Sequence, residues 1–235
     1  MEAADDRSHV EDLLARHGVL GACVHDIRAM TDAFTRCFRS GGKLLVCGNG
    51  GSAADAEHLQ GELMKRYRLA RPLPADTKAR LRATVPSSAM AERLAEGLEG
   101  ALPVLPLVGH SALMTAIAND TDADLVFAQQ VVGYGRAGDA LLAISTSGRS
   151  RNVVLAAWTA RALGMSVVSL TGAGGGALAE AADIAVKVPL EETSAIQEEH
   201  LAIYHYLSAV LEERFFGTRE EPDRTPESLA GRGPT

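Results

Sequence analysis

Five short aliphatic runs alternate with longer helical patterns, and this alternation restricts the fold more than any other feature. The runs lie at 43–46, 104–108, 140–145, 165–170 and 183–188. Helical periodicity occupies the segments between them, around 110–118, 123–133 and 150–163. Short aliphatic strands that alternate with helices form parallel βαβ units. The pattern therefore predicts an α/β protein built on a doubly wound parallel sheet.

Composition narrows the class of protein. Of the 235 residues, 46% are hydrophobic and only 4% aromatic, which is typical of helices that cover a sheet of aliphatic strands. The net charge of −7 argues against sequence-independent binding to nucleic acid or to an anionic membrane. We find no apolar signal-peptide core and no run near the length of a membrane span, so we expect a soluble, cytoplasmic protein. Three widely spaced cysteines, Cys23, Cys37 and Cys47, are expected to be reduced.

Residues 8–40 carry a helical hydrophobic stripe that His17-Gly18 interrupts, so two helices are expected there. The stripe consists of Val10, Leu13, Leu14, Val19, Leu20, Val24, Ile27, Met30, Phe34 and Phe38. A monomer would expose it, so we predict that copies of the chain pack together through these helices and a last helix at 194–215. The predicted divisions are an N-terminal helical segment at 1–40, a sheet domain at 41–216 and a disordered tail at 217–235.

Two turns of small residues follow predicted strands, at the sheet edge where parallel sheets bind ligands. The first, "GNGGS" at 48–52, leads into a helix near Ser52, and its glycines would let an anion approach the helix N-terminus. The second, "STSGRS" at 145–150, has four hydroxyl side chains that suit a phosphate monoester. We expect one phosphorylated ligand to span both turns. The alternative is a pair of ordinary capped turns, with Ser52 as an N-cap.

No nucleotide is expected at these turns, because the second lacks the lysine of a Walker A loop and neither matches GxGxxG.

Two helices carry candidate acid/base groups. His58 and Glu62 are four residues apart, so they share a face of the helix that the first turn opens. Gln197 and His205 are eight residues apart, close to two turns, on the last helix. A carboxylate and an imidazole from different helices form an acid/base couple, and the same groups are suited to zinc. Spacing permits His200 as well as His205. Taken one at a time, each of these residues is more simply explained as a surface or interface residue.

Six stretches resemble one known family. They read "LLVCGNGGSAADAEHLQGEL", "RYRLARP", "TAIAND", "GDALLAISTSGRSRNVVLAA", "LTGAGGGALAEAADIAVKVP" and "IQEEHLAIYHYL". Their order and number are similar to those of the sugar isomerase (SIS) domain family, and within it of the phosphoheptose isomerases. With the helices between them, the stretches cover most of residues 20–216.

The resemblance implies a three-layer sandwich with a five-stranded parallel sheet flanked by helices. It also implies N-terminal helices for oligomerisation and a homotetramer with sites at subunit interfaces. The implied reaction converts D-sedoheptulose 7-phosphate to D-glycero-D-manno-heptose 7-phosphate through an enediol, with Glu62 as the base and His205 as its acid/base partner. One zinc ion per subunit is implied, and its matching ligands are His58, Glu62, Gln197 and His205. Positions that match substrate contacts are Asn49, Gly50, Gly51, Ser52, Arg66, Asn119, Asp120, Ser145, Thr146, Ser147, Ser150 and Gln197.

The chain departs from the family's pattern at two places. Ser194-Ala195 stands where the isomerases often carry an Asp that contacts substrate. About thirty residues are also inserted, at about 75–102, with an amphipathic helix that Ser87 or Ser88 can cap and a cluster of basic side chains. The insertion is either a surface excursion without a role or a lid or interface element near the pocket.

Two other functions compete with the isomerase. A non-catalytic protein of the DnaA initiator-associating type shares the fold but does not keep the catalytic pair, whereas Glu62 and His205 are both present here. Sugar-phosphate-sensing regulators carry a DNA-binding domain, and residues 1–40 are too short and acidic for one. Amino-sugar isomerases tend to have two sugar-isomerase domains, and this chain has one. These comparisons favour the isomerase.

Overall fold

A computed structural model of the chain describes residues 6–217, and its centre is one parallel sheet. Within the described residues the sheet has five strands in the order β2-β1-β3-β4-β5, with every neighbouring pair parallel. They are β1 (Leu44–Cys47), β2 (Val104–Pro106), β3 (Ala140–Ile144), β4 (Ser166–Thr171) and β5 (Ile184–Lys187). Each coincides with one of the predicted aliphatic runs, so the predicted α/β fold is confirmed.

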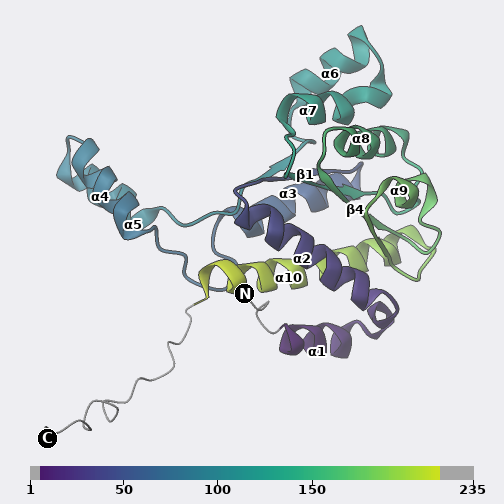
Figure 1. Ribbon diagram of the computed structural model, residues 1–235, viewed down its shortest axis with the longest axis horizontal. Coiled ribbons are helices and arrows are strands. Elements are labelled where there is room, and N and C mark those ends of the chain that lie inside the picture. Colours follow the sequence, from purple (N-terminus) through teal and green to yellow (C-terminus); the bar gives the residue numbers. More distant parts are fainter. Residues whose placement is uncertain (1–5, 218–235) are drawn as a thin grey trace, which may run out of the picture.

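Helices cover both faces of this sheet, which gives three layers (Figure 1). One face packs against α2 (Val24–Arg39), α3 (Gly51–Met64) and α10 (Thr193–Phe216), with α1 (Arg7–Arg16) against α10. The other packs against α6 (Ser111–Asp120), α7 (Val126–Tyr134), α8 (Arg151–Ala162) and α9 (Gly176–Ala181). Two 3-10 turns complete the described elements, η1 (Gly18–Cys23) and η2 (Ala123–Leu125).

Successive side chains of a strand point into different cores, one on each face of the sheet. Leu44 and Val46 point into the core beneath α2 and α3, whereas Leu45 and Cys47 point into the core beneath α7 and α8. Because successive strand residues face opposite sides, a sheet covered on both faces needs an unbroken apolar run. All four residues of β1 are accordingly buried.

The N-terminal helices correct one part of the sequence prediction. They are two, as expected, because α1 ends at Arg16 and α2 begins at Val24 after the η1 turn. Most of the stripe is not exposed, however, since Ile27, Met30 and Phe34 are each at most 1% exposed within the single chain, and Val19, at 37%, is the exception among the large hydrophobic residues of the stripe. They belong to the same core as α10 and the sheet. The N-terminal stripe therefore gives no argument that copies of the chain associate.

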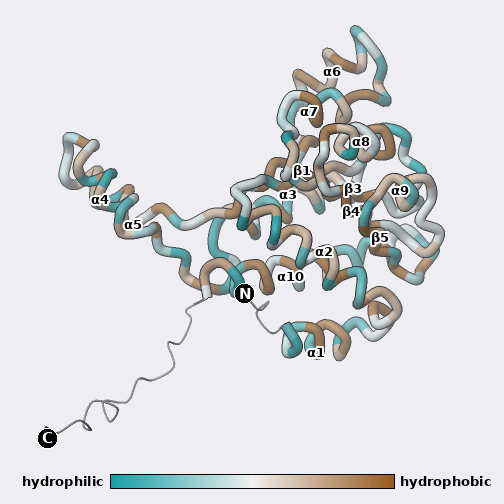
Figure 2. Tube along the Cα trace, in the orientation of Figure 1, coloured by the Kyte–Doolittle hydropathy of each residue, from teal (hydrophilic) through white to brown (hydrophobic). Residues whose placement is uncertain are grey.

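The inserted residues form a helical hairpin, α4 (Ala75–Thr84) and α5 (Ser88–Gly97). Ser87 caps α5 by accepting a hydrogen bond from the Met90 N–H, so the expected cap is confirmed. The other helix of the hairpin, α4, was not predicted, because its residues carry no buried stripe. The hairpin stands away from the sheet domain (Figure 1), and hydrophilic and hydrophobic residues alternate along it (Figure 2). Ion pairs from Lys78 and Arg82 to Glu96 join its two helices.

Cys23, Cys37 and Cys47 are free and buried, as expected for reduced thiols. In the part of the chain that the structure describes, no helix combines the length and apolar character that a membrane crossing requires. The predicted disordered tail falls almost entirely on residues 218–235, which lie outside the described residues.

Candidate active site

Both small-residue turns lie at the carboxyl edge of the sheet. β1 ends at Cys47 before the first turn, and its neighbour β3 ends at Ile144 before the second. The two turns are joined by a reciprocal pair of amide hydrogen bonds, of 2.9 and 3.0 Å, between the side chains of Asn49 and Asn152. Asn152 was not predicted from the sequence, although its place at the start of α8, just after the hydroxyl turn, was a usable signal.

The hydroxyl turn is held in a tight conformation. Ser145 is buried, and its Oγ lies 3.0 Å from the Oγ of Ser150. The Ser147 hydroxyl accepts a hydrogen bond from the Arg149 N–H at 3.2 Å. Gly148 has a φ of +64°, and a Cβ there would collide with the Gly175 carbonyl, so only glycine fits. The turn thus presents several hydroxyl groups beside a helix N-terminus.

The glycine turn begins α3 one residue earlier than predicted. Gly50 has a φ of +56°, and the helix starts at Gly51. Ser52 lies inside the first turn of the helix, is buried, and makes no capping hydrogen bond. The interpretation of Ser52 as an N-cap is therefore wrong, and the exposed residues of this turn are Asn49, Gly50 and Gly51.

Helix α10 lies alongside α3 and runs in the same direction. The Gln197 amide packs against Gly51 at the start of α3. About two turns further along both helices, Tyr204 contacts His58. Beyond the end of α3, Glu212 binds the loop at 67–69. This parallel arrangement, which no local pattern specifies, determines which side chains of the two helices meet.

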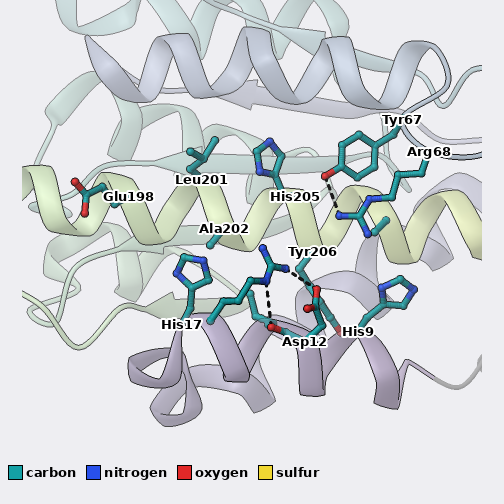
Figure 3. A pocket seen from close by; sticks show the side chains of 13 residues that line it. His9, Asp12, His17, Tyr67, Arg68, Glu198, Leu201, Ala202, His205 and Tyr206 are labelled. Atoms are coloured by element: carbon teal, nitrogen blue, oxygen red, sulfur yellow. Dashed lines mark hydrogen bonds and ion pairs between the residues drawn. The ribbon is translucent and has the colours of Figure 1, made fainter.

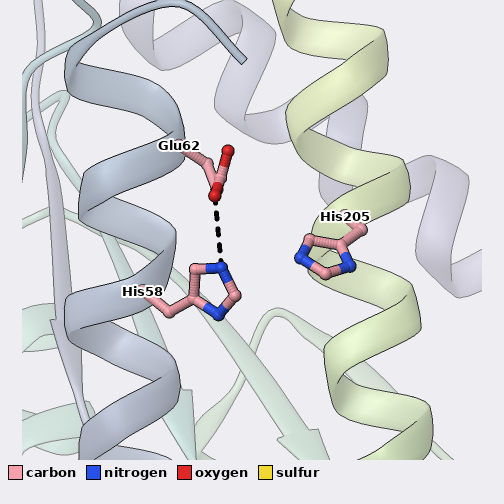
Figure 4. A group of neighbouring side chains, drawn as sticks. All are labelled: His58, Glu62 and His205. Atoms are coloured by element: carbon pink, nitrogen blue, oxygen red, sulfur yellow. Dashed lines mark hydrogen bonds and ion pairs between the residues drawn. The ribbon is translucent and has the colours of Figure 1, made fainter. Parts of the chain in front are cut away.

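His58, Glu62 and His205 meet between these helices (Figure 4). One ligand-capable atom of each lies within 4.8 Å of the others. His58 Nε2 is 3.2 Å from Glu62 Oε1, and the rings of His58 and His205 have centroids 5.2 Å apart. The structure thus brings three of the four predicted metal ligands together, and their roles stay predictions.

His200 lies elsewhere. It is fully buried, and its Nε2 is 3.4 Å from the Thr171 carbonyl oxygen. Burial lowers the pKa of His200 to about 4, so this imidazole is neutral at pH 7. The choice that spacing left open thus falls to His205, because His205 and not His200 faces His58 and Glu62.

The environment of His205 also favours the neutral imidazole. Burial and the neighbouring His58 lower the pKa of His205, and the Glu62 carboxylate partly opposes them. The ring stacks on Tyr67, with centroids 5.9 Å apart and planes 17° apart. A neutral imidazole can accept a proton at pH 7 and return it.

A buried ion pair ties both helices to the loop that carries Tyr67. Glu212 accepts hydrogen bonds of 2.7–2.9 Å from the backbone N–H groups of 67–69 and from Arg71 Nε. Arg71 donates in turn to the carbonyl oxygens of Leu63 and Glu62, at the end of α3. Burial alone would raise the pKa of Glu212, but these hydrogen bonds outweigh it and lower that pKa. Sequence reasoning missed this pair, because its partners are about 140 residues apart.

Beside this group a small polar cavity of about 120 Å³ opens between α1 and α10. His205, Tyr67 and Arg68 line one side of it, and side chains of α1 such as His9 and Asp12 line the other (Figure 3). His205 therefore has His58 and Glu62 on one side and this cavity on the other.

Four other predicted site residues lie outside the group of His58, Glu62 and His205. Arg66 is exposed and pairs with Glu99 at the base of the hairpin. The Asn119 amide donates to Asp120 at 2.7 Å at the end of α6. The Gln197 amide contacts Gly51 at the start of α3. Roles for these four residues stay predictions.

The donor set fits a divalent cation. Two imidazole nitrogens and a carboxylate oxygen are ligands that zinc accepts, and three protein ligands are typical of catalytic zinc sites. His58 also has a partner for its second nitrogen, because Nδ1 lies 3.0 Å from the Tyr204 hydroxyl. Metal-binding histidines usually have such a partner.

Comparison with known proteins identifies the family of this chain. The sequence profile of the SIS domain matches residues 17–96 and 83–172. The phosphoheptose isomerase of Rhodospirillum rubrum is 40% identical over 194 residues, which are 83% of this chain and 88% of that protein. Solved phosphoheptose isomerase structures from Neisseria gonorrhoeae and Francisella tularensis are each 31% identical, with TM-scores of 0.67 and 0.68. The alignments cover 88% and 91% of this chain, and 96% and 100% of those chains.

The five-stranded parallel sheet and these similarities over most of the chain lead to one assignment. The chain belongs to the phosphoheptose isomerase branch of the SIS domain family.

Proposed function

We propose that the protein is an isomerase that converts D-sedoheptulose 7-phosphate to D-glycero-D-manno-heptose 7-phosphate. Membership of the phosphoheptose isomerase family supports the reaction. The observation that carries the proposal is the meeting of Glu62 with His205 across two helices, next to the turns that suit a sugar phosphate. An aldose–ketose isomerisation needs a proton moved between adjacent carbons and another between their oxygens, so two titratable groups suffice.

Each member of the pair has one task in this reaction. The Glu62 carboxylate removes the proton from C1 of the ketose and returns it to C2, and the electron pair forms the enediol between these steps. The neutral imidazole of His205 carries a proton between the two oxygens. General acid/base groups of this kind contribute about 10²–10⁴-fold each to the rate.

The substrate positions proposed here follow from the two turns. Hydroxyl groups of Ser145, Thr146, Ser147 and Ser150 would bind the phosphate, and Asn49 to Ser52 would bind the sugar. Seven residues of helix separate Gly51 from His58, a rise of about 10 Å.

His58, Glu62 and His205 would hold a divalent cation, with Gln197 proposed as a fourth ligand and zinc as the metal. When bound there, the cation would supply positive charge for the negative oxygens that develop during the reaction.

The proposal is tested with purified protein and sedoheptulose 7-phosphate in D₂O, followed by NMR with and without a chelator. We expect aldose 7-phosphate to form, with deuterium incorporated at C1 or C2. A protein that forms no product and exchanges no deuterium would not be an isomerase of this substrate, and a binding role would replace the enzymatic one.

A further inference from the structure

A buried tyrosine next to the proposed metal site is not required by the isomerisation itself. Tyr204 precedes His205 on α10 and is 2% exposed. Its hydroxyl lies 3.0 Å from His58 Nδ1 and 3.3 Å from Asp55 Oδ1. Asp55 and His58 are three residues apart on α3, so one phenol can reach both side chains.

The protons in this chain of contacts have one favoured arrangement. An ionised Asp55 can only accept, so the single hydroxyl proton of Tyr204 is donated to its Oδ1. The phenol oxygen then accepts from His58, which places the ring proton on Nδ1. His58 Nε2 is left with a lone pair.

That lone pair points at another acceptor. His58 Nε2 is 3.2 Å from Glu62 Oε1, so two electron-rich atoms face each other across the space that His205 also borders. A cation bound by both atoms would relieve the repulsion. The Nδ1–H form of His58 is therefore the form that is ready to bind a metal.

We propose that Tyr204 and Asp55 are positioning residues that hold His58 in the Nδ1–H tautomer and aim its Nε2 at a divalent cation shared with Glu62 and His205. The inference rests on the metal site of the proposed function. It adds a residue on α10 that acts through His58 without touching the cation or the substrate.

The expected size of the effect follows from known metal sites. Removal of the partner that orients a metal-binding histidine typically lowers metal affinity by about 10–100-fold. Tyr204→Phe removes only the hydroxyl and keeps the ring that packs against His58, with centroids 5.3 Å apart. Folding should be retained, which thermal unfolding would verify.

The experiment measures zinc affinity by competition with a chromophoric chelator. Tyr204→Phe should bind zinc about 10–100-fold more weakly than the unmodified chain, and Asp55→Asn should change affinity in the same direction. Tyr206→Phe is the matched control. It lies on the same helix, is 5% exposed, and its hydroxyl donates to Asp6 at 2.9 Å, so its zinc affinity should be unchanged.

A double-mutant cycle separates orientation of His58 from a general structural role. In a His58→Ala background, Tyr204→Phe should have no further effect on zinc affinity. The inference is wrong if Tyr204→Phe weakens zinc binding equally in the unmodified chain and in the His58→Ala background. It is also wrong if Tyr204→Phe leaves the zinc affinity of the unmodified chain unchanged. In either case the isomerase proposal stands. An unmodified chain that binds no zinc would overturn this inference and the metal site together, while leaving the reaction to the NMR test.

Discussion

At the scale of single residues, Glu62 combines two proposed roles that one substitution can separate. Glu62→Gln keeps the shape of the side chain and one acceptor oxygen but removes the basic carboxylate. We expect isomerisation to fall by at least about 10²-fold, while the sugar phosphate still binds. The measurements are turnover by NMR, ligand affinity by calorimetry and zinc content by mass spectrometry on the same samples.

The matched control for this change is Glu57→Gln, an exposed glutamate on the same helix. It should leave turnover and zinc content close to those of the unmodified chain. Near-normal turnover in Glu62→Gln would contradict the assignment of the base.

His200 predicts a dependence of stability on pH. Its pKa is lowered to about 4 in the folded state by burial, against about 6.5 in an unfolded chain. Between these values the unfolded state binds more protons, so the free energy of unfolding should fall as pH falls from about 6.5 to 4. The shift corresponds to about 3 kcal/mol over the whole window.

A His200→Gln variant, which cannot bind a proton, should lose that part of the dependence. Urea unfolding at fixed protein concentration, compared at pH 7 and pH 4.5, measures it. Equal pH dependence in the two proteins would show that His200 already titrates freely when folded.

At the scale of elements, the Arg71–Glu212 pair joins α3, α10 and the loop between α3 and the hairpin. Both side chains are at most 1% exposed, and removal of one charge leaves the other buried without its partner. Such losses cost about 3–5 kcal/mol. We therefore expect Glu212→Gln to lower the free energy of unfolding by that amount in a urea titration.

Glu213→Gln is the neighbouring control. Its carboxylate is 51% exposed and pairs with His9, so the change should cost less than about 1 kcal/mol. Similar midpoints for the two variants would remove the structural importance assigned to Glu212.

The α4–α5 hairpin is expected to be dispensable for folding. Only Ala91 and Ala95 of its two helices are buried, and its ends are already paired through the bridge between Pro72 and Glu99. Replacement of 74–98 by two glycines should change Tm by less than about 4 °C, which corresponds to about 1 kcal/mol. Retained turnover would identify a surface excursion, and a fall in turnover with unchanged Tm would identify a lid or interface element.

At the scale of the whole molecule, the homotetramer stays a prediction that rests on the family resemblance, because the N-terminal stripe is internal. We expect light scattering at micromolar concentration to give four times the chain mass of 24.7 kDa. Leu201, 38% exposed on α10 beside the polar cavity, is a residue we expect at the interface.

Leu201→Glu should therefore shift the mass to smaller species. Leu163→Glu, at an equally exposed leucine at the end of α8 on the opposite side of the sheet, should leave the mass unchanged. A monomer in the unmodified protein would contradict the prediction.

From the sequence alone, the strands, the two turns and the His58–Glu62 pair could be predicted. These features depend on neighbours within a few residues, through alternation of side chains along a strand, a positive φ at a glycine, or the period of a helix. The shared helix face of His58 and Glu62 follows from such a local pattern, and so do the strands. The positions of the turns at one sheet edge follow as well, because strands joined by βαβ units are parallel.

Spacing left His200 and His205 open and the family resemblance implied His205, but only the tertiary structure shows which of them faces His58 and Glu62. It also buries most of the N-terminal stripe within its own chain. Five residues turn a helix by about 140°, so the two histidines face different neighbours, and which one faces α3 depends on how α10 packs. The same packing brings Tyr204 to His58 and Glu212 to Arg71. Contacts between residues more than a hundred positions apart arise from the burial of whole helix faces, and no local pattern encodes their register.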